Sequence, residues 1–277
     1  RNKRNIVTAG ALKPVIGFLA SENSGLQGNA VALVITLSAS STNKAIIGAS
    51  GVFPPLLQIL TDAATSSQAK FDSLMALHNL SSHKENLVKL LEAEPVPALI
   101  GLLKSSRRSS RIAGKCTALI EILMGYEEAR SALASEDGGV LSVVEVLESG
   151  SVENGEHAVG ALLTMCRGDR SKYREAILRE GAIPGLLEFT VQGSPKSQHG
   201  ARVLLRLLRD DEPRSSSEVQ EADTFENIVS NIMSQMEDDD GVVDEDDGCG
   251  KSKKMVSDMV QLSMELSLKR MQDRASV

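Results

Sequence analysis

The chain has 277 residues, of which 42% are hydrophobic, yet it contains two Tyr and no Trp, so its core must consist mainly of Leu, Val, Ile and Ala side chains. It holds three cysteines, an odd number without the CxxC or Cys/His spacing of metal sites, which favours a reducing compartment, the cytoplasm or the nucleus. No apolar run reaches the roughly 20 residues of a membrane-spanning helix. No signal peptide opens the chain, and because Arg1 falls inside a repeated pattern, we expect a piece of a longer protein.

The net charge of −7 is unevenly distributed along the chain. Residues 210–277 carry 18 acidic and 7 basic side chains, a net charge of −11, whereas residues 1–209 carry a net charge of +4. We therefore expect two parts, a mildly basic domain over 1–209 and an acidic tail over 210–277. Opposite charges of this kind allow the tail to interact with the domain or with its ligands.

One helical pattern recurs five times along residues 1–209, at a spacing of 41 to 44 residues. A period of 40 to 47 residues made of two or three helices is typical of armadillo and HEAT solenoids. The sequence therefore predicts an all-α solenoid of about five three-helix repeats, the first of them truncated, in which each repeat buries its apolar face only against its neighbours. The equivalent turn positions, each followed by an apolar run, are Gly10, Gly51, Glu94, Gly138 and Gly181.

The second repeat serves as the model for the others. We expect Asn43 to cap a short first helix over residues 44–50, and Gly51 to permit a sharp turn where a side chain would strain the backbone. The second helix begins near Pro54, an early position where a missing N–H costs little. The third helix is predicted from Ser67 to Ser81 by apolar residues at helical spacing. The positions equivalent to Asn43 are Asn2, Asn86, Arg130 and Tyr173.

Two segments carry a family resemblance, MALHNLSS at residues 75–82 and EGAIPGLLEF at residues 180–189. Together with the order of cap, turn glycine and proline, they resemble armadillo repeats over residues 1–209. More narrowly, the chain resembles the armadillo region of plant U-box ubiquitin ligases, and MVQLSMELSLKRMQDRA at residues 259–275 resembles a C-terminal helix of some of those proteins. The resemblance implies a right-handed superhelix whose third helices line a concave groove.

The resemblance also supplies the functional expectation. It implies a protein-interaction module, the substrate-binding or partner-binding part of a plant-type U-box ligase whose U-box is absent from this chain. The alternative is a standalone armadillo adaptor. We expect no catalytic site, metal or other cofactor, because the chain contains no phosphate-binding loop, no G-x-S-x-G elbow and no H-E-x-x-H motif. Nucleic-acid binding has little support, because few aromatic side chains offer stacking.

Six residues are the candidates for partner binding. In the armadillo proteins of nuclear import, an Asn of the third helix holds the ligand backbone and a Trp one turn earlier stacks on it. Here only Asn79 keeps the family residue and no Trp is present, so we do not expect that mode of binding an extended basic peptide. The C-terminal basic residues are predicted to contact an acidic or phosphorylated segment; the alternative is that they are solvated helix-face charges. The candidates are Asn79, Lys115, His157, His199, Arg202 and Arg206.

Two further segments allow alternative interpretations. In RRSSR, residues 107–111, Ser109 or Ser110 is expected to cap the next helix, and the alternative is a kinase target. In the tail, residues 225–236 form an amphipathic pattern that predicts a helix covering the last repeat, or else a free partner-binding helix. Residues 237–250 are acidic and predict a disordered linker, and residues 252–274 predict a final helix with a Met-rich stripe.

Overall fold

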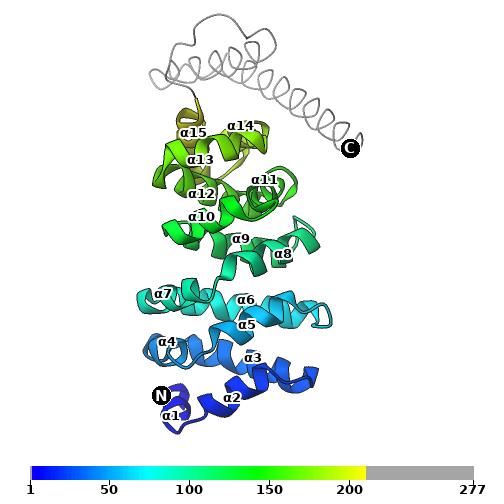
Figure 1. Cartoon of the computed structure of the whole chain (residues 1–277), viewed down its shortest axis with the longest axis vertical. Coiled ribbons are helices and arrows are strands. Elements are labelled where there is room, and N and C mark those ends of the chain that lie inside the picture. The colour runs from blue at the N-terminus through cyan, green and yellow to red at the C-terminus, as the bar shows by residue number, and fades with distance from the viewer. Residues whose placement is uncertain (1, 210–277) are drawn as a thin grey trace, which may run out of the picture. The chain divides into compact units, whose positions relative to one another are not determined.

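The computed structural model describes residues 2–209, and within them fifteen α-helices and no strands follow one another (Figure 1). The helices form five units of three, so the predicted all-α armadillo solenoid is confirmed. The units are α1 (Asn2–Thr8), α2 (Leu12–Leu19) and α3 (Ser24–Ser38); α4 (Ser41–Gly48), α5 (Phe53–Thr61) and α6 (Ser67–Ser81); α7 (Lys84–Glu92), α8 (Pro95–Ser105) and α9 (Arg111–Leu123); α10 (Glu127–Ser135), α11 (Gly139–Ser149) and α12 (Val152–Gly168); and α13 (Arg170–Arg179), α14 (Ile183–Gln192) and α15 (Pro195–Leu208).

Equivalent helices of successive units pack on one another. The third helices form one continuous row, α3 on α6, α6 on α9, α9 on α12 and α12 on α15, and the second helices form a parallel row from α2 to α14. Between them lie fully buried leucines, for example Leu74, Leu77 and Leu80 of α6, each with no exposed surface. Because each unit leaves an apolar face that only its neighbour covers, the core is one unbroken column.

The turn between the first and second helices repeats in backbone conformation as well as in sequence. All five equivalent residues have positive φ: Gly10 at 84°, Gly51 at 78°, Glu94 at 49°, Gly138 at 61° and Gly181 at 74°. Among the described residues, Glu94 is the one residue with a side chain that adopts this left-handed conformation. The predicted role of Gly51 is confirmed, and the third unit builds the same turn against a steric cost.

The third helices begin at side-chain caps. Ser110 accepts a hydrogen bond from the backbone N–H of Ala113 at 3.1 Å, as one of the two predicted caps of α9. Ser66 and Ser151 cap α6 and α12 in the same way. Ser109 is exposed, and its role as a kinase target stays a prediction.

The expected capping role of Asn43 is wrong. Helix α4 already begins at Ser41, and Asn43 lies inside it with no exposed surface. Its Nδ2 donates to the carbonyl of Lys3 in the previous unit, at 3.1 Å, and to that of Leu37, at 3.2 Å. Asn43 therefore ties two units together, because the stacking of α4 on α1 buries its amide next to a carbonyl of the previous unit, and a buried amide needs such a partner.

The same arrangement recurs in the third unit. Nδ2 of Asn86 donates to Lys44 in the previous unit, at 2.9 Å, and to Leu80, at 3.1 Å. At the equivalent position of the fourth unit, Nη1 of Arg130 reaches the carbonyl six residues earlier, that of Met124, at 2.8 Å. Polar side chains at this position therefore satisfy backbone carbonyls at the unit boundaries.

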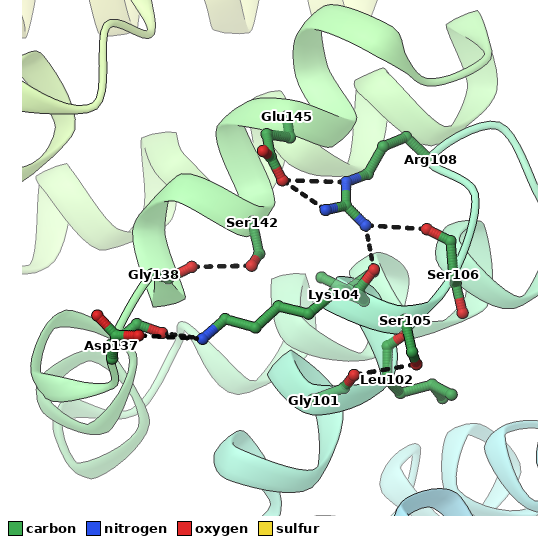
Figure 2. A network of polar contacts seen from close by, with 11 residues as sticks. Gly101, Leu102, Lys104, Ser105, Ser106, Arg108, Asp137, Gly138, Ser142 and Glu145 are labelled. Carbon is green, nitrogen blue, oxygen red and sulfur yellow. Dashed lines mark hydrogen bonds and ion pairs between the residues drawn. The ribbon is translucent and has the colours of Figure 1, made fainter. Parts of the chain in front are cut away.

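A second polar connection joins the third unit to the fourth (Figure 2). Arg108 lies in the α8–α9 loop and donates through Nε, at 3.2 Å, and Nη2, at 2.5 Å, to the carboxylate of Glu145 on α11. Its Nη1 donates to the carbonyls of Leu103 and Ser106, which end α8. One guanidinium therefore caps a helix and forms an ion pair across a unit boundary.

The described helices were also compared with the length and apolar composition of a membrane-spanning helix. No single helix among residues 2–209 is long and apolar enough to cross a membrane, although α4 and α5 together, bent by 83°, pass the same test of length and composition. The predicted helix 225–236, linker 237–250 and helix 252–274 lie outside the described residues, and the division of the chain into 1–209 and 210–277 stays a prediction.

Candidate partner-binding surface

The candidate site is the solvent-facing side of the five third helices, here called the third-helix face. Residues three, four and seven positions apart lie on the same side of a helix, so each helix contributes one residue to each of three rows. Of the residues in these rows, only Ala118 is buried. In order from α3 to α15, the rows are Asn29, Asp72, Lys115, His157 and His199; Ala32, Met75, Ala118, Gly160 and Arg202; and Thr36, Asn79, Ile122, Thr164 and Arg206.

The N-terminal half of the third-helix face is only weakly charged. Asp72 accepts a hydrogen bond from Gln68 at 2.8 Å within α6. Asn79, the candidate that matches the armadillo pattern, is half-buried, and its Nδ2 lies 3.4 Å from the hydroxyl of Ser38 in the previous unit. The Asn79 amide therefore bridges α6 and α3 through one long contact and retains further hydrogen-bonding capacity for a ligand.

The middle of the face holds a contact between a carboxylate and an imidazole that the sequence did not predict. The carboxylate of Glu121 on α9 lies 2.8 Å from Nδ1 of His157 on α12. This approach requires the glycine at position 160, because a β-carbon there would lie 2.1 Å from Oε1 of Glu121. The sequence did contain a signal for this contact, because the other units carry a side chain at the position of Gly160.

Two further basic or titratable residues, His78 and Lys115, lie near this pair. Burial lowers the pKa of His78 on α6, and the nearby charges of Lys115 and His157 lower it further. His78 is therefore held in its neutral form over a wider pH range. Two of the candidates, Lys115 and His157, therefore lie near the same residue, His78.

The other basic candidates lie on α15. His199 and Arg206 are exposed, and Arg202 is half-buried. Nε of Arg202 is buried and donates to none of the described residues. Because this Nε is buried, a carboxylate or phosphate from outside can bind only the exposed part of the half-buried Arg202 side chain, whose planar guanidinium matches such anions.

The described residues offer little that is chemically reactive. No group of three or more His, Cys, Asp and Glu side chains among them is arranged to hold a metal ion. Cys116 and Cys166 are buried, and burial raises the pKa of both thiols, so neither is poised as a thiolate nucleophile.

Comparison with known proteins agrees with this architecture. Residues 2–229 match the family model described as plant U-box protein ARM repeat region. The chain is 31% identical over 251 residues to U-box domain-containing protein 17 of Arabidopsis thaliana, covering 75% of this chain and 34% of that protein. It is 29% identical over 221 residues to U-box domain-containing protein 45 of the same plant, covering 80% of this chain and 28% of that protein. The chain thus spans about a third of these relatives.

Solved structures show the same fold. The designed armadillo repeat protein YIII(Dq)4CqI superposes with a TM-score of 0.65 at 24% identity, covering 75% of this chain and 86% of that one. A second designed armadillo repeat protein, YIII(Dq.V1)4CPAF, was solved in complex with the peptide (KR)4 and superposes with a TM-score of 0.64 at 22% identity, covering 75% and 85% of the two chains.

Proposed function

Because the chain belongs to the family described as plant U-box protein ARM repeat region, we propose that its solenoid is the part of a plant U-box ubiquitin ligase that binds the substrate or another partner protein. The observation that carries this proposal is family membership over residues 2–229 combined with a third-helix face that offers ligand-binding side chains and no catalytic group. The second candidate is a standalone adaptor that binds the same partners without a ligase. Either function operates in the cytoplasm or the nucleus, where the buried Cys116 and Cys166 remain free thiols.

The ligand of this surface is, in this proposal, an acidic or phosphorylated segment of a partner protein. The support is the gathering of Arg202, Arg206 and His199 on α15. Arginine binds carboxylates and phosphates through charge-assisted, often bidentate hydrogen bonds. This mode of binding differs from that of the nuclear import proteins, in which an Asn of the third helix holds the ligand backbone, since among the equivalent positions here Asn79 alone is Asn.

A charge-reversal experiment tests the binding surface. The tagged chain carrying Arg202→Glu and Arg206→Glu is compared with wild type for capture of partners from plant extract. A control, Lys84→Glu with Arg179→Glu, makes the same change in charge at exposed residues of first helices. We expect the first variant to lose the partners and the control to retain them. Equal capture by all three proteins would show that the third-helix face is not the binding surface.

A second experiment separates the ligase from the adaptor. The chain lacks a U-box motif of its own, so in plant cells an excess of it should occupy the partner and shield it from the ligase. We expect the half-life of the captured partner to lengthen when wild type is expressed, and to stay unchanged with the Arg202→Glu, Arg206→Glu variant. A partner that binds but keeps its half-life under both conditions would favour the adaptor.

A further inference from the structure

Resting on the proposed function, we propose that the third-helix face between α9 and α15 binds an extended partner segment of mixed charge. A basic residue of that segment pairs with Glu121, and an acidic or phosphorylated residue about three positions along the segment pairs with Arg202. This arrangement follows from the position of the Glu121 carboxylate, the surroundings of Arg202, the distance between these two residues and the repulsion between like charges.

The carboxylate of Glu121 lies over the neighbouring unit. Its Oε2 is 2.8 Å from Nδ1 of His157 on α12, while Oε1 lies close to the backbone of Gly160, where a β-carbon would clash with it. The side chain keeps 29% of its surface exposed. A carboxylate has about four lone-pair directions and His157 takes one of them, so Oε1 remains available to an ammonium or guanidinium group of a ligand.

Arg202 offers the opposite charge in the next unit. It occupies the row position equivalent to Gly160, and its Nε is buried without an acceptor among the described residues. Neither an ion pair nor a hydrogen bond to a described residue occupies it, whereas Glu121 already holds His157. Arg202 is therefore a positive group without a partner among the described residues, and an external carboxylate or phosphate can pair with the exposed part of its half-buried side chain.

The spacing between the two charges follows from helix packing. Glu121 projects over Gly160 of α12, and Arg202 lies at the equivalent position of α15, which packs directly on α12. Axes of packed helices lie about 8–10 Å apart. An extended chain advances about 3.3 Å per residue, so a basic and an acidic residue about three positions apart reach both groups.

The same geometry disfavours a uniformly acidic ligand. If the ligand carried a second acidic residue between Arg202 and α9, its carboxylate would lie next to that of Glu121, and like charges at an interface repel each other. Lys115 and His157 were predicted to extend the acid-binding surface, but Glu121 places a negative charge next to His157. Glu121 therefore acts as a specificity residue that selects the register of the ligand.

Peptide binding to the full chain tests the inference. Short fluorescein-labelled Gly/Ser peptides carry Lys and Glu about three positions apart, in both orders, or Glu at both positions, or Lys at both. Fluorescence anisotropy then gives their affinities for wild type, Glu121→Gln, Arg202→Gln and Glu128→Gln. Glu121→Gln removes the charge and keeps an oxygen for His157, and Glu128→Gln is the matched control at an exposed residue of α10.

We expect wild type and Glu128→Gln to bind one of the two mixed peptides about tenfold more tightly than the Glu/Glu peptide, the effect of one partly desolvated charge pair. Glu121→Gln should lose that preference, and Arg202→Gln should weaken the mixed and the Glu/Glu peptides alike. The inference is overturned if wild type binds the Glu/Glu peptide at least as tightly as both mixed peptides, if the Glu121→Gln variant keeps the preference, or if no peptide binds.

These outcomes are distinct from failure of the proposed function. If partner capture from extract depends on Arg202 and Arg206 but peptide preference does not depend on Glu121, only the mixed-charge inference falls. If capture is also insensitive to the reversal of Arg202 and Arg206, the third-helix face is not the partner-binding surface and both fall. Equal urea midpoints of unfolding for Glu121→Gln and wild type confirm that the variant is folded.

Discussion

The side-chain oxygen of Asn86 lies where a β-carbon of Gly48 would be, only 1.9 Å from that position. Asn86 belongs to the third unit and Gly48 ends α4 of the second, so the glycine admits a side chain from the neighbouring unit. The same relationship occurs between Asn154 of α12 and Gly114 of α9, where the oxygen would lie 2.2 Å from a β-carbon. In both pairs the Nδ2 of the asparagine donates to two carbonyls.

The first prediction follows from this contact. Gly48→Ala should destabilise the protein by about 2 kcal/mol, because it displaces the buried Asn86 amide, which then loses its two hydrogen bonds to the carbonyls of Lys44 and Leu80. The loss outweighs the gain of at most about 1 kcal/mol expected from alanine in a helix. Urea unfolding followed by circular dichroism measures the change.

The control for this variant is Gly101→Ala in α8, where an added β-carbon meets nothing within 4 Å. There the helix propensity acts alone, so we expect stabilisation by about 0.5–1 kcal/mol. Stabilisation of both variants would show that Asn86 moves aside without cost.

The second prediction concerns the strained turn at Glu94, with φ at 49°. Glu94→Gly should stabilise the protein by about 0.5–1 kcal/mol, because a left-handed residue with a side chain costs about 1–2 kcal/mol and the greater chain entropy of glycine offsets about half of it. Thermal or urea midpoints measure the effect.

The reverse substitution at an equivalent turn is the comparison. Gly51→Ala, at φ 78° with no atom within 4 Å of the added β-carbon, should destabilise the protein by about 1 kcal/mol through backbone strain alone. If neither variant changes the midpoint, conformational strain at these turns is not significant.

The third prediction concerns Arg108, which is hydrogen-bonded to Glu145 and to two carbonyls that end α8. Arg108→Ala should cost about 2 kcal/mol, since partly buried charge-assisted hydrogen bonds are lost. Arg108→Lys keeps the charge but not the planar fork, so it should recover only part of the loss. The exposed neighbour Arg107 provides the control, and Arg107→Ala should change the stability by less than about 0.5 kcal/mol. Equal effects at Arg107 and Arg108 would contradict the role given to the guanidinium.

The fourth prediction is a pH dependence at the boundary between α10 and α13. Hydrogen bonds from Lys172, Tyr173 and Arg130 lower the pKa of Glu127 from 4.5 to about 2. Because the folded pKa lies below the unfolded value, the stabilisation is fully present above pH 4.5 and is lost as the pH falls toward 2. Glu127→Gln should therefore lower the urea midpoint at pH 7, and its difference from wild type should shrink below pH 4.5.

An NMR titration of the carboxyl carbons provides the direct measurement. The midpoint for Glu127 should lie well below 4.5, and substituting Lys172 by Met should raise it, since the Lys172 hydrogen bond is the largest cause of the shift. A Glu127 midpoint near 4.5 in wild type would remove the basis for this prediction. Glu128→Gln, next to it on α10, supplies the control for removal of one carboxylate.

The period of the sequence, by itself, determined the architecture. Turn residues recurring at 41 to 44 residues predicted five units, and the stripe of Leu74, Leu77 and Leu80 predicted helix α6 at its observed bounds. Both are consequences of local chemistry, since backbone freedom at a turn and apolar spacing along a helix are written in consecutive residues. The rows of the third-helix face followed from the same register.

Only the tertiary structure decided which polar side chains cross from one unit to the next. Asn43 has the residue type of a helix cap, but it links to Lys3 instead, because stacking of the units brings the Lys3 carbonyl within 3.1 Å of its side chain. Glu121 contacts His157, which is 36 residues away in the chain, because Gly160 has no side chain and the Glu121 carboxylate occupies that space. Such pairs depend on the rise and rotation from one unit to the next, and the sequence of a single unit does not determine these quantities. The fold of each unit, in contrast, depends on residues that are close together in the chain.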